Sequence, residues 1–498
     1  MKYKDVINLL VIGIGPHSKR VYLPAIKKLS SKHKVKIVYG LELLEKKNHV
    51  SEFLEKNNYS FPVLYIKGFD KNRSLPTSLK NKLNKLVSDE KIDGVIIATE
   101  PMVHKQYALW ALQQGLNILM DKPITVRKDV VSDLKQAKGI EKDFLLLENK
   151  YLELQKKKET IFSVNVQRRY HFGIIKVLDL IKEITEKYNV PVTSIQSTHA
   201  DGQWYFPIEI LERKYHSLND GYGKCSHSGY HFFELVTQIY KAGSVEGKNG
   251  DNAEIYSSFI QPDGWLSNIS EKDYISYFGN EYKKYSKNIN QKEFKQFFKN
   301  YGELDALSSI RINKEETAVC NISINLLHNS FSQRTWLEQG EDLYKGNGRV
   351  KQEHHIIQQG PFQSIHIHAY QEKDDHSVTT TDDYKIGGAN HFEIHVFRNL
   401  GAFSNKKTDT INRQSFKIYD LKEINGSRYL DDSQLTHEFV KQHVVEEFIE
   451  FIEGKRNKNS LISNIDSHNL SVKIMSSIYQ SHIKRAENKA PIINISLK

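Results

Sequence analysis

Continuous runs of hydrophobic residues alternate with amphipathic segments over the first third of the chain. Such short runs are typical of strands buried on both faces of a parallel sheet, and the amphipathic segments between them are typical of covering helices. We expect strands at Val6–Ile12, Val35–Tyr39, Val63–Ile66, Gly94–Ala98 and Asn117–Met120. We expect helices at Lys19–Leu29, Leu43–Lys56, Leu79–Val87 and His104–Gln114. This part of the sequence therefore predicts an α/β domain.

The pattern changes further along the chain. Residues 125–158 are expected to be mostly helical with a break near Gly139, and a strand at Ile161–Gln167 and a helix at Phe172–Lys187 follow. After about residue 190, hydrophobic and polar residues alternate, which is typical of antiparallel strands with one covered face. The expected strands are Thr193–His199, Ala318–Leu326, Ser364–Tyr370 and Phe392–Phe397. Residues 241–316 fit neither pattern.

The sequence Gly13-Ile14-Gly15 lies between the first expected strand and the first expected helix. In that context the first glycine permits a tight turn, and the second lets the backbone approach a pyrophosphate at the helix N-terminus. Ser18 replaces the usual third glycine by another small residue. Glu42, just past the second strand, would accept hydrogen bonds from the adenosine ribose and repel a 2′-phosphate, which favours NAD. Lys46 and Lys47 nearby leave NADP as an alternative.

These patterns together predict two domains. The first, over residues 1–124, is an α/β Rossmann domain that binds a dinucleotide. The second, over residues 125–498, is an α+β domain with a large, mainly antiparallel open sheet. Within it, residues 241–430 are divergent or expanded. Helices return at His437–Glu453 and Asp466–Asn488, and we expect the helices of residues 437–488 to pack back on the core.

Composition narrows the class of partner. The 498 residues carry a net charge of +11, but the basic residues are scattered, and the densest run is Lys156-Lys157-Lys158. We therefore expect an acidic small molecule rather than nucleic acid. The two cysteines predict neither a disulfide framework nor a metal cage. There is no apolar run of membrane-spanning length, and the first apolar stretch leads into a glycine turn instead of a cleavage site, so we expect a cytoplasmic protein.

Two further stretches carry a resemblance to a known family. Ile96-Ile97-Ala98-Thr99 is followed by Pro101, His104, Ala111 to Gly115, and then Asp121-Lys122-Pro123. The second stretch contains Gly223, His227, Gly229, His231 and Glu234 at the spacing of a second motif, and Ile478-Tyr479-Gln480-Ser481 resembles a closing motif. The chain thus resembles the glucose–fructose oxidoreductase / inositol dehydrogenase / MocA family over residues 6–240 and roughly the last sixty residues.

The resemblance implies hydride transfer between a nicotinamide and a hydroxyl or keto carbon of a sugar, nucleotide sugar, phosphorylated polyol or cyclitol. It implies that Lys122 polarises the reacting oxygen or shares its proton, and that His231 acts as general base. Substrate-binding residues would be His227, Arg168 and Trp204. Cofactor-binding residues would be Gly13, Ile14, Gly15, Glu42, Thr99, His104, Asp121, Lys122 and Gln167.

His227 departs from the family pattern, because it stands where the family has an aspartate and brings no fixed negative charge. This leaves two alternatives to a dehydrogenase. One is a non-catalytic sensor that binds a dinucleotide and a partner protein. The other is an NAD-recycling glycosidase or epimerase that oxidises its substrate only transiently.

Four more histidines occur on expected strands of the second domain. His366 and His368 share one strand face, and His391 and His395 lie on another strand. Because the strand order does not follow from the sequence, a metal site there stays open, and solvent-facing or interface histidines are favoured. We therefore predict no metal site. The resemblance implies a homo-oligomer that forms through the sheet of the second domain.

Overall fold

The computed structural model describes residues 6–212, 218–335, 337, 348–372, 385–399, 401, 415–425 and 437–497. Two compact units emerge from it. Unit 1 comprises Met1–Arg127, Gly139–His171 and Thr436–Val472, and unit 2 comprises Lys128–Lys138, Phe172–Leu435 and Lys473–Lys498. Both units are assembled from separate stretches of the chain, so the predicted single boundary after residue 124 stays a prediction.

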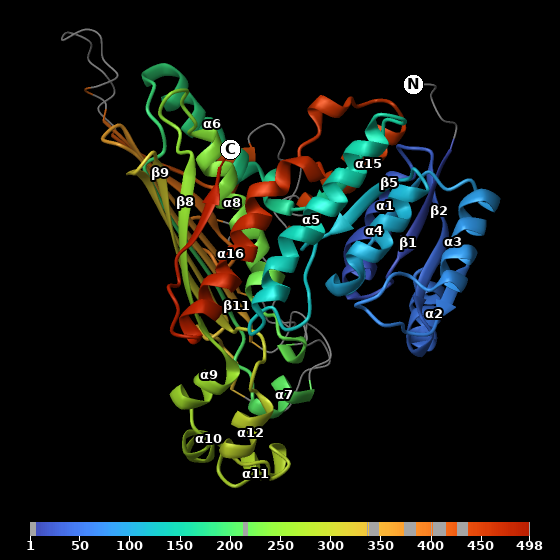
Figure 1. Cartoon of the computed structure of the whole chain (residues 1–498), viewed down its shortest axis with the longest axis horizontal. Coiled ribbons are helices and arrows are strands. Elements are labelled where there is room, and N and C mark those ends of the chain that lie inside the picture. The colour runs from blue at the N-terminus through green and yellow to red at the C-terminus, as the bar shows by residue number, and fades with distance from the viewer. Residues whose placement is uncertain are drawn as a thin grey trace. The chain divides into compact units, whose positions relative to one another are not determined.

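Unit 1 contains a six-stranded, wholly parallel sheet, drawn mainly in blue in Figure 1. Its strands are β1 (Ile7–Ile12), β2 (Val35–Leu43), β3 (Val63–Ile66), β4 (Gly94–Ile97), β5 (Asn117–Asp121) and β6 (Phe162–Asn165). They lie in the order β3-β2-β1-β4-β5-β6. This is the Rossmann order, in which the direction of winding reverses between β1 and β4 and ligands bind beyond the carboxyl ends there. The predicted Rossmann fold is confirmed.

Helices complete the core of unit 1. They are α1 (Leu23–Leu29), α2 (Lys47–Lys56), α3 (Thr77–Asp89), α4 (His104–Gln113) and α15 (His437–Ile452). The last of these comes from the far end of the chain. Its residues Val444, Phe448 and Ile449 are fully buried in one hydrophobic cluster with Leu9 and Val11 of β1. The Rossmann core is therefore completed by a helix encoded more than 400 residues after the first strand.

Helix α5 (Leu134–Gln155) runs through Gly139 without interruption, so the predicted break near this residue is wrong. The glycine is explained by packing. A Cβ atom at Gly139 would lie 2.3 Å from the guanidinium of Arg127, which pairs with Asp143 at 2.7 Å. Glycine is used there because a side chain passes close to the helix, and the helix tolerates it because propensity is a weak constraint.

Unit 2 contains a nine-stranded sheet in the order β14-β13-β12-β11-β7-β10-β9-β8-β15. Its strands are β7 (Ser194–Gly202), β8 (Asn252–Ile260), β9 (Asp305–Lys314), β10 (Thr317–Leu327), β11 (Val350–Gln359), β12 (Gln363–Glu372), β13 (Phe392–Arg398), β14 (Phe416–Tyr419) and β15 (Ile493–Ser496). Only β7 and β10 pair in parallel. The predicted large, mainly antiparallel sheet is confirmed.

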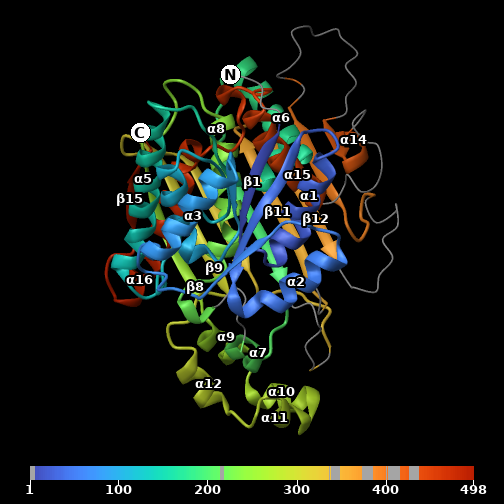
Figure 2. The same ribbon diagram turned by 90° about the vertical axis from the view of Figure 1, so that its right-hand side faces the viewer.

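Helices lie on one face of this sheet, as Figures 1 and 2 show. They include α6 (Phe172–Tyr188), α8 (Tyr230–Ala242) and α16 (Asn469–Ala486), and the short α7 (Pro207–Glu212) and α14 (Leu421–Asn425) also belong to unit 2. The stretch at 241–316 that the sequence left unassigned holds β8, β9 and four short helices. They are α9 (Pro262–Asn268), α10 (Glu271–Phe278), α11 (Glu281–Tyr285) and α12 (Gln291–Phe297).

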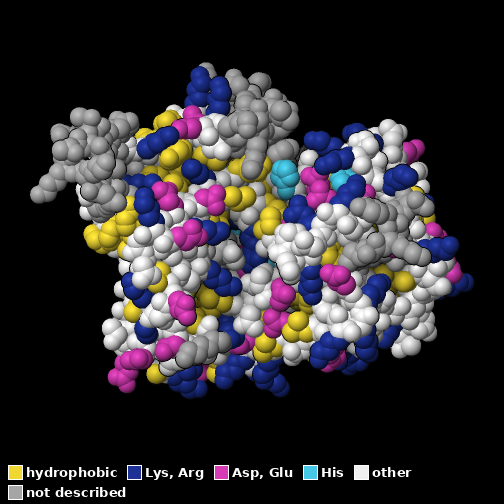
Figure 3. Space-filling model, turned by 90° about the horizontal axis from the view of Figure 1, so that it is seen from above, with side chains coloured by type: hydrophobic (Ala, Val, Ile, Leu, Met, Phe, Trp, Pro, Cys, Tyr) yellow, Lys and Arg dark blue, Asp and Glu magenta, His cyan; other side chains and the backbone are white. Residues whose placement is uncertain are grey.

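Two surface properties bear on the class of partner. In the described part of the chain, no helix combines the length and the apolar character needed to cross a bilayer. On the face drawn in Figure 3, basic and acidic side chains are interspersed over the described residues. A mixed surface of this kind is not the continuous basic footprint that nucleic-acid binding uses.

Candidate active site

The glycine turn after β1 has the geometry that its sequence predicted. Gly13 has a φ of +92°, and a Cβ atom there would lie 2.6 Å from the carbonyl oxygen of Ala98. Only glycine fits such a left-handed position against another backbone. At Gly15, by contrast, a Cβ would meet nothing within 4 Å. The turn thus packs tightly on the end of β4 and leaves open space at Gly15, where a pyrophosphate needs room.

Two side chains fix the shape of this turn. The Ser18 hydroxyl, which takes the place of the third glycine, donates a 2.5 Å hydrogen bond to the carbonyl oxygen of Gly13. Glu42, 5% exposed, accepts from the backbone N–H of Ile14 at 2.7 Å and from that of Leu43 at 2.8 Å. Lys46 lies 3.7 Å from the same carboxylate. Glu42 therefore ties the glycine turn to the end of β2, and each oxygen keeps a second lone pair.

The Asp121-Lys122-Pro123 segment begins at the carboxyl end of β5. The backbone N–H of Lys122 donates to Oδ1 of Asp121 at 3.0 Å, and the Lys122–Pro123 peptide bond is cis. The ring of His104 contacts the segment: its Nδ1 atom lies 2.8 Å from the Pro123 carbonyl oxygen, and its Nε2 atom lies 3.2 Å from the Thr99 carbonyl oxygen. Burial lowers the pKa of His104. This histidine joins the loops that follow β4 and β5.

Three residues at this edge escaped the sequence reasoning. His17 places Nε2 3.8 Å from the carboxylate of Asp121 and 3.4 Å from the amide nitrogen of Asn165. Asn165, the last residue of β6, donates to the Tyr22 hydroxyl at 2.6 Å. Burial lowers the pKa of His17 to about 3 although Asp121 opposes the shift, so the imidazole is neutral. The position of Asn165 at the end of its strand could have indicated a site residue, because Asp121 ends the neighbouring strand in the same way.

Gln167 and Arg168 follow β6 in a short 3₁₀ turn, Gln167–Tyr170. Arg168 is 7% exposed. The Oε1 atom of Gln167 is buried without a hydrogen-bond partner among the residues that the structure describes. Buried acceptors in proteins are normally hydrogen-bonded, so this oxygen is suited to accept a hydrogen bond from a bound group near the end of β6.

Unit 2 carries the second predicted motif. His227 lies in a π-helical turn, Cys225–Gly229, and His231 lies in the first turn of α8. A Cβ atom on Gly223 would lie 2.1 Å from the Glu303 carbonyl oxygen, which explains this glycine of the motif. The π-helical turn is a geometry often found at functional sites. The backbone therefore presents both histidines from one irregular helix start.

A buried carboxyl group holds this helix start. Glu303, 0% exposed, accepts from the Cys225 backbone N–H at 2.7 Å and from the Tyr479 hydroxyl at 2.9 Å. The Tyr479 hydroxyl also lies 2.7 Å from that of Ser226. Burial raises the pKa of Glu303 to about 7. The closing motif around Tyr479 thus acts on the histidine-bearing turn through Glu303.

Charged groups cluster beside the same turn. Lys224 is fully buried, with Nζ 3.5 Å from the carboxylate of Asp201, which also pairs with Arg349. Burial lowers the pKa of Lys224 to about 8, against the pull of Asp201. Burial opposes ionisation of Asp201, but Arg349 and Lys224 outweigh it and hold the pKa of that carboxyl well below its usual value. Sequence reasoning passed over Lys224, although it is the motif residue after Gly223.

The remaining predicted residues lie elsewhere in unit 2. Trp204 stacks on Phe206 at 5.6 Å between ring centroids and donates to the Tyr274 hydroxyl at 3.3 Å. It belongs to the aromatic cluster of α9 to α12 and makes no hydrogen bond or ring contact with either histidine. Its predicted contact with substrate stays a prediction.

The strand histidines come together on the large sheet. His366 of β12 is opposite His395 of β13, and the rings of His368 and His395 are 4.8 Å apart. His354 of β11 adds a further ring, with Nδ1 3.2 Å from that of His368. His391 instead stacks on Tyr370. Strand order, which the sequence did not give, is what assembles this group.

Comparison with known proteins decides the family. The model of the GFO_IDH_MocA family, described as "Oxidoreductase family, NAD-binding Rossmann fold", matches residues 7–143. Residues 7–143 belong to this oxidoreductase family. The family's cofactor agrees with the predicted NAD, and its matched region holds the glycine turn, Glu42 and Asp121-Lys122-Pro123. No curated relative matches the chain by sequence.

Three solved structures with the same fold are distant from this chain in sequence. A levoglucosan dehydrogenase in complex with NADH and levoglucosan is 12% identical, with a TM-score of 0.57 over 99% of this chain and 100% of that one. An aldose-aldose oxidoreductase from Caulobacter crescentus, complexed with glycerol, is 10% identical, with a TM-score of 0.54 over 99% and 100%. An NAD binding oxidoreductase from Klebsiella pneumoniae is 12% identical, with a TM-score of 0.55 over 99% of each chain. At these identities the similarity concerns the fold.

Proposed function

We propose that this member of the oxidoreductase family is an NAD-dependent dehydrogenase of a sugar, nucleotide sugar or cyclitol. The observation that carries the proposal is the edge of the parallel sheet in unit 1. There the open turn at Gly15, the carboxylate of Glu42 and the Asp121-Lys122 segment occupy the carboxyl ends of β1, β2 and β5. Ligands of doubly wound sheets bind at that edge.

The residues of this edge suit NAD. Gly13 and Gly15 would admit the pyrophosphate to the start of the helical segment, and Ile14 would line it. Glu42 would accept the adenosine ribose hydroxyls with the lone pairs that its two backbone hydrogen bonds leave. When bound, NAD supplies the hydride acceptor or donor of the reaction.

The chain's own task is to place the substrate oxygen and to handle its proton. For oxidation, the C–H bond breaks as hydride leaves, the O–H proton goes to a base, and the carbon–oxygen bond becomes a carbonyl. By the family resemblance, we assign Lys122 to polarise the substrate oxygen and His231 to act as general base. His104, fully buried on the Thr99 and Pro123 carbonyls, would act by positioning the Lys122 loop. Asp121, Gln167 and Arg168 would complete the nicotinamide side of the site.

The substrate class rests on two observations. The family model is that of oxidoreductases, and two fold neighbours, a levoglucosan dehydrogenase and an aldose-aldose oxidoreductase, were solved with levoglucosan or glycerol. The net charge of +11 further favours an acidic ligand, such as a phosphorylated or nucleotide-linked sugar. His227 would donate or accept one hydrogen bond to such a substrate where relatives present an aspartate.

The test is a screen of sugars, inositols, sugar phosphates and nucleotide sugars for reduction of NAD⁺, followed by absorbance. We expect turnover with at least one of them. Lys122→Met and His231→Asn should lower kcat by about 100-fold or more while NAD binding persists. Lys67→Met, at an exposed lysine of the same unit, serves as the matched control. Unchanged kcat in both site variants would refute the assignment.

His227 favours one second candidate, a non-catalytic sensor that binds NAD and a partner protein. The absence of turnover with every substrate, together with tight NAD binding and retention of a specific protein partner, would establish it. Product formation without net reduction of NAD⁺ would instead indicate a glycosidase or epimerase that recycles the cofactor.

Assembly and location are part of the proposal. We propose a homo-oligomer that forms through the open face of the nine-stranded sheet and a cytoplasmic location. Size-exclusion chromatography with light scattering measures the first directly. A monomeric mass at micromolar concentration would contradict it.

A further inference from the structure

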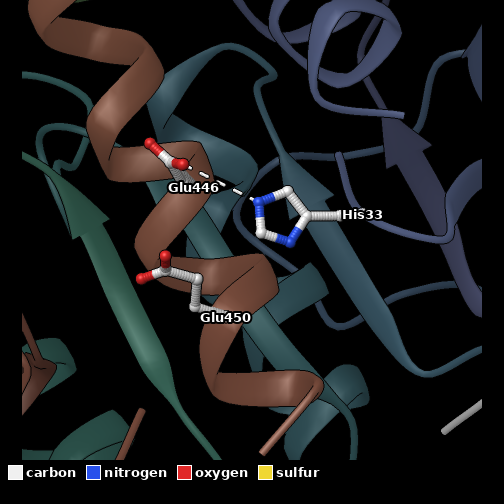
Figure 4. A group of neighbouring side chains, drawn as sticks. All are labelled: His33, Glu446 and Glu450. Atoms are coloured by element: carbon white, nitrogen blue, oxygen red, sulfur yellow. Dashed lines mark ion pairs between the residues drawn. The ribbon is translucent and has the colours of Figure 1, made fainter. Parts of the chain in front are cut away.

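Three side chains in unit 1 form a group with the chemistry of metal ligands. His33 precedes β2, and Glu446 and Glu450 lie one turn apart on α15. One ligand atom of each lies within 4.8 Å of the others, and Figure 4 shows the Glu446 carboxylate directed at the His33 ring, with Glu450 one turn further along the same helix. Within the described residues this is the one such group of three. It lies outside the glycine turn and the Lys122 segment described above.

The imidazole is held in the orientation that a metal ligand needs. His33 is 2% exposed, and its Nδ1 lies 2.8 Å from Oε2 of Glu453. A hydrogen on Nδ1 donated to that carboxylate leaves Nε2 with a bare lone pair. Nε2 is buried without a hydrogen-bond partner among the described residues, and it lies 3.7 Å from Oε1 of Glu446. Metal-binding histidines almost always donate the second ring N–H to a carboxylate, a backbone carbonyl or water.

The spacing also suits an ion. Two ligands of a tetrahedral zinc ion at about 2.0 Å lie about 3.3 Å apart. The 3.7 Å between Nε2 and Glu446 exceeds a hydrogen bond and comes close to that separation. A nitrogen lone pair that faces a carboxylate oxygen is repelled unless a cation or proton lies between them. The geometry of His33 therefore calls for a positive charge at this point.

Existing ion pairs of the carboxylates leave room for the ion. Lys32 lies 2.5 Å from Oε1 of Glu446, but its side chain is 62% exposed and is readily displaced. Oε2 of the same residue faces Nδ1 of His443 at 3.6 Å. Arg456 takes Oε2 of Glu450 at 2.9 Å.

Cations flank the carboxylates of this group. Lys32 and His443 lie beside Glu446. Behind the ring, Lys455 pairs with Glu453 at 2.8 Å. These cations pair with the carboxylates, and no described residue lies within hydrogen-bond distance of His33 Nε2.

We propose that His33, Glu446 and Glu450 bind a divalent transition-metal ion of the zinc type, and that Glu453 orients His33. One imidazole nitrogen with two carboxylate oxygens is a ligand set that zinc accepts and magnesium does not favour. The ion would join the segment before β2 to helix α15. No spacing rule connects residues 33 and 446, which is why the sequence predicted no metal site.

The experiment uses the full chain, stripped with a chelator and titrated with ZnCl₂ by calorimetry, with MgCl₂ as the comparison. We expect zinc to bind and magnesium not to bind at this site. Glu450→Gln, at a residue that is only partly buried, should weaken zinc binding at least tenfold without unfolding the chain. Glu453→Gln should weaken it roughly 10- to 100-fold, as loss of an orienting carboxylate does. Lys32→Ala should leave it equal or tighter.

A matched control addresses the other histidine group. His354→Ala with His368→Ala removes the two sheet rings whose Nδ1 atoms are 3.2 Å apart and which could also hold zinc. The proposal requires the zinc site to persist in that double variant. It also requires zinc to raise the Tm of the wild type but not of Glu450→Gln. Three results would each overturn the proposal. They are no zinc binding to the wild type, wild-type zinc affinity in both Glu450→Gln and His33→Gln, and loss of zinc binding only in the sheet variant.

Discussion

Glu303 gives a sharp test of how burial and hydrogen bonding hold the histidine turn of unit 2. The carboxyl group is 0% exposed and accepts two hydrogen bonds through Oε1, from the Cys225 N–H and the Tyr479 hydroxyl. Glu303→Gln keeps an amide oxygen in that place and can keep both bonds. It removes only the ability to ionise. The variant therefore isolates the effect of the buried charge.

The sign and size follow from the pKa. Burial raises the pKa of Glu303 from 4.5 to about 7, so the folded chain holds a proton that the unfolded chain has released between these values. The corresponding stability is fully present below about pH 4.5 and is lost as the pH rises through about 7. The difference amounts to about 3 kcal/mol, and full burial means that solvent screening reduces it little. The variant should lack this loss.

Differential scanning calorimetry from about pH 5 to about pH 8 measures the effect. Over this range the unit 2 transition of the wild type should fall by roughly 4–5 °C more than that of Glu303→Gln. Glu316→Gln, at an exposed carboxylate of the same unit, should follow the wild type. Parallel curves for Glu303→Gln and wild type would refute the reasoning, because they would show that this carboxyl group does not change its protonation on folding.

Three more predictions rest on single contacts. Gly13→Ala should lower the free energy of unfolding by about 3 kcal/mol and abolish NAD binding, because a Cβ would lie 2.6 Å from a carbonyl oxygen at a φ of +92°. Calorimetry measures the binding, and wild-type affinity would contradict this prediction. Glu42→Gln should shift the ratio of NADP to NAD affinity by about tenfold toward NADP, because it removes the charge that repels a 2′-phosphate and leaves Lys46 in place. An unchanged ratio would show that Glu42 only stabilises the glycine turn and does not select the cofactor. Arg334→Met should lower the free energy of unfolding, measured by chemical denaturation, by about 3–5 kcal/mol. The reason is that Glu209, which lies 2.6 Å from Arg334 and is 3% exposed, would become an unpaired buried charge. The double variant Arg334→Met with Glu209→Gln should recover part of the loss.

The fold of unit 1 was predictable because its strands are buried on both faces and read as continuous apolar runs. Strand β11 was not, since its inward positions include His355 and Gln359. Nδ1 of His355 lies 3.0 Å from the Ser197 hydroxyl, and Gln359 donates to the Ile181 carbonyl at 3.1 Å, so polar residues occupy a buried face. Periodicity carries no signal for such a strand. The break at Gly139 was wrong because a single sequence cannot show that Arg127 passes over that glycine.

Some residues of the candidate site could be found from the sequence, and others could not. Gly13, Glu42 and Lys122 lie at or just beyond strand ends in one continuous part of the chain, so the order of elements along the sequence was enough to find them. His17 and Asn165 needed the neighbour relation of β5 and β6, which only the folded sheet supplies. Lys224 and Glu303 needed knowledge of burial, because both are ordinary charged residues in the sequence and become unusual only at 0% exposure.

Completion of the Rossmann core by α15 has a consequence for biosynthesis. A ribosome delivers the six strands of this sheet long before it delivers Val444, Phe448 and Ile449, which cover Leu9 and Val11. During that interval the nascent sheet exposes the apolar surface that the late helix will bury, a condition that recruits chaperones and favours aggregation. Expression of residues 1–171 alone, which hold all six strands, should for the same reason yield an insoluble fragment, and supplying residues 436–472 as a separate peptide should restore its solubility. The late helix would then complete the folding of unit 1 in the nascent chain.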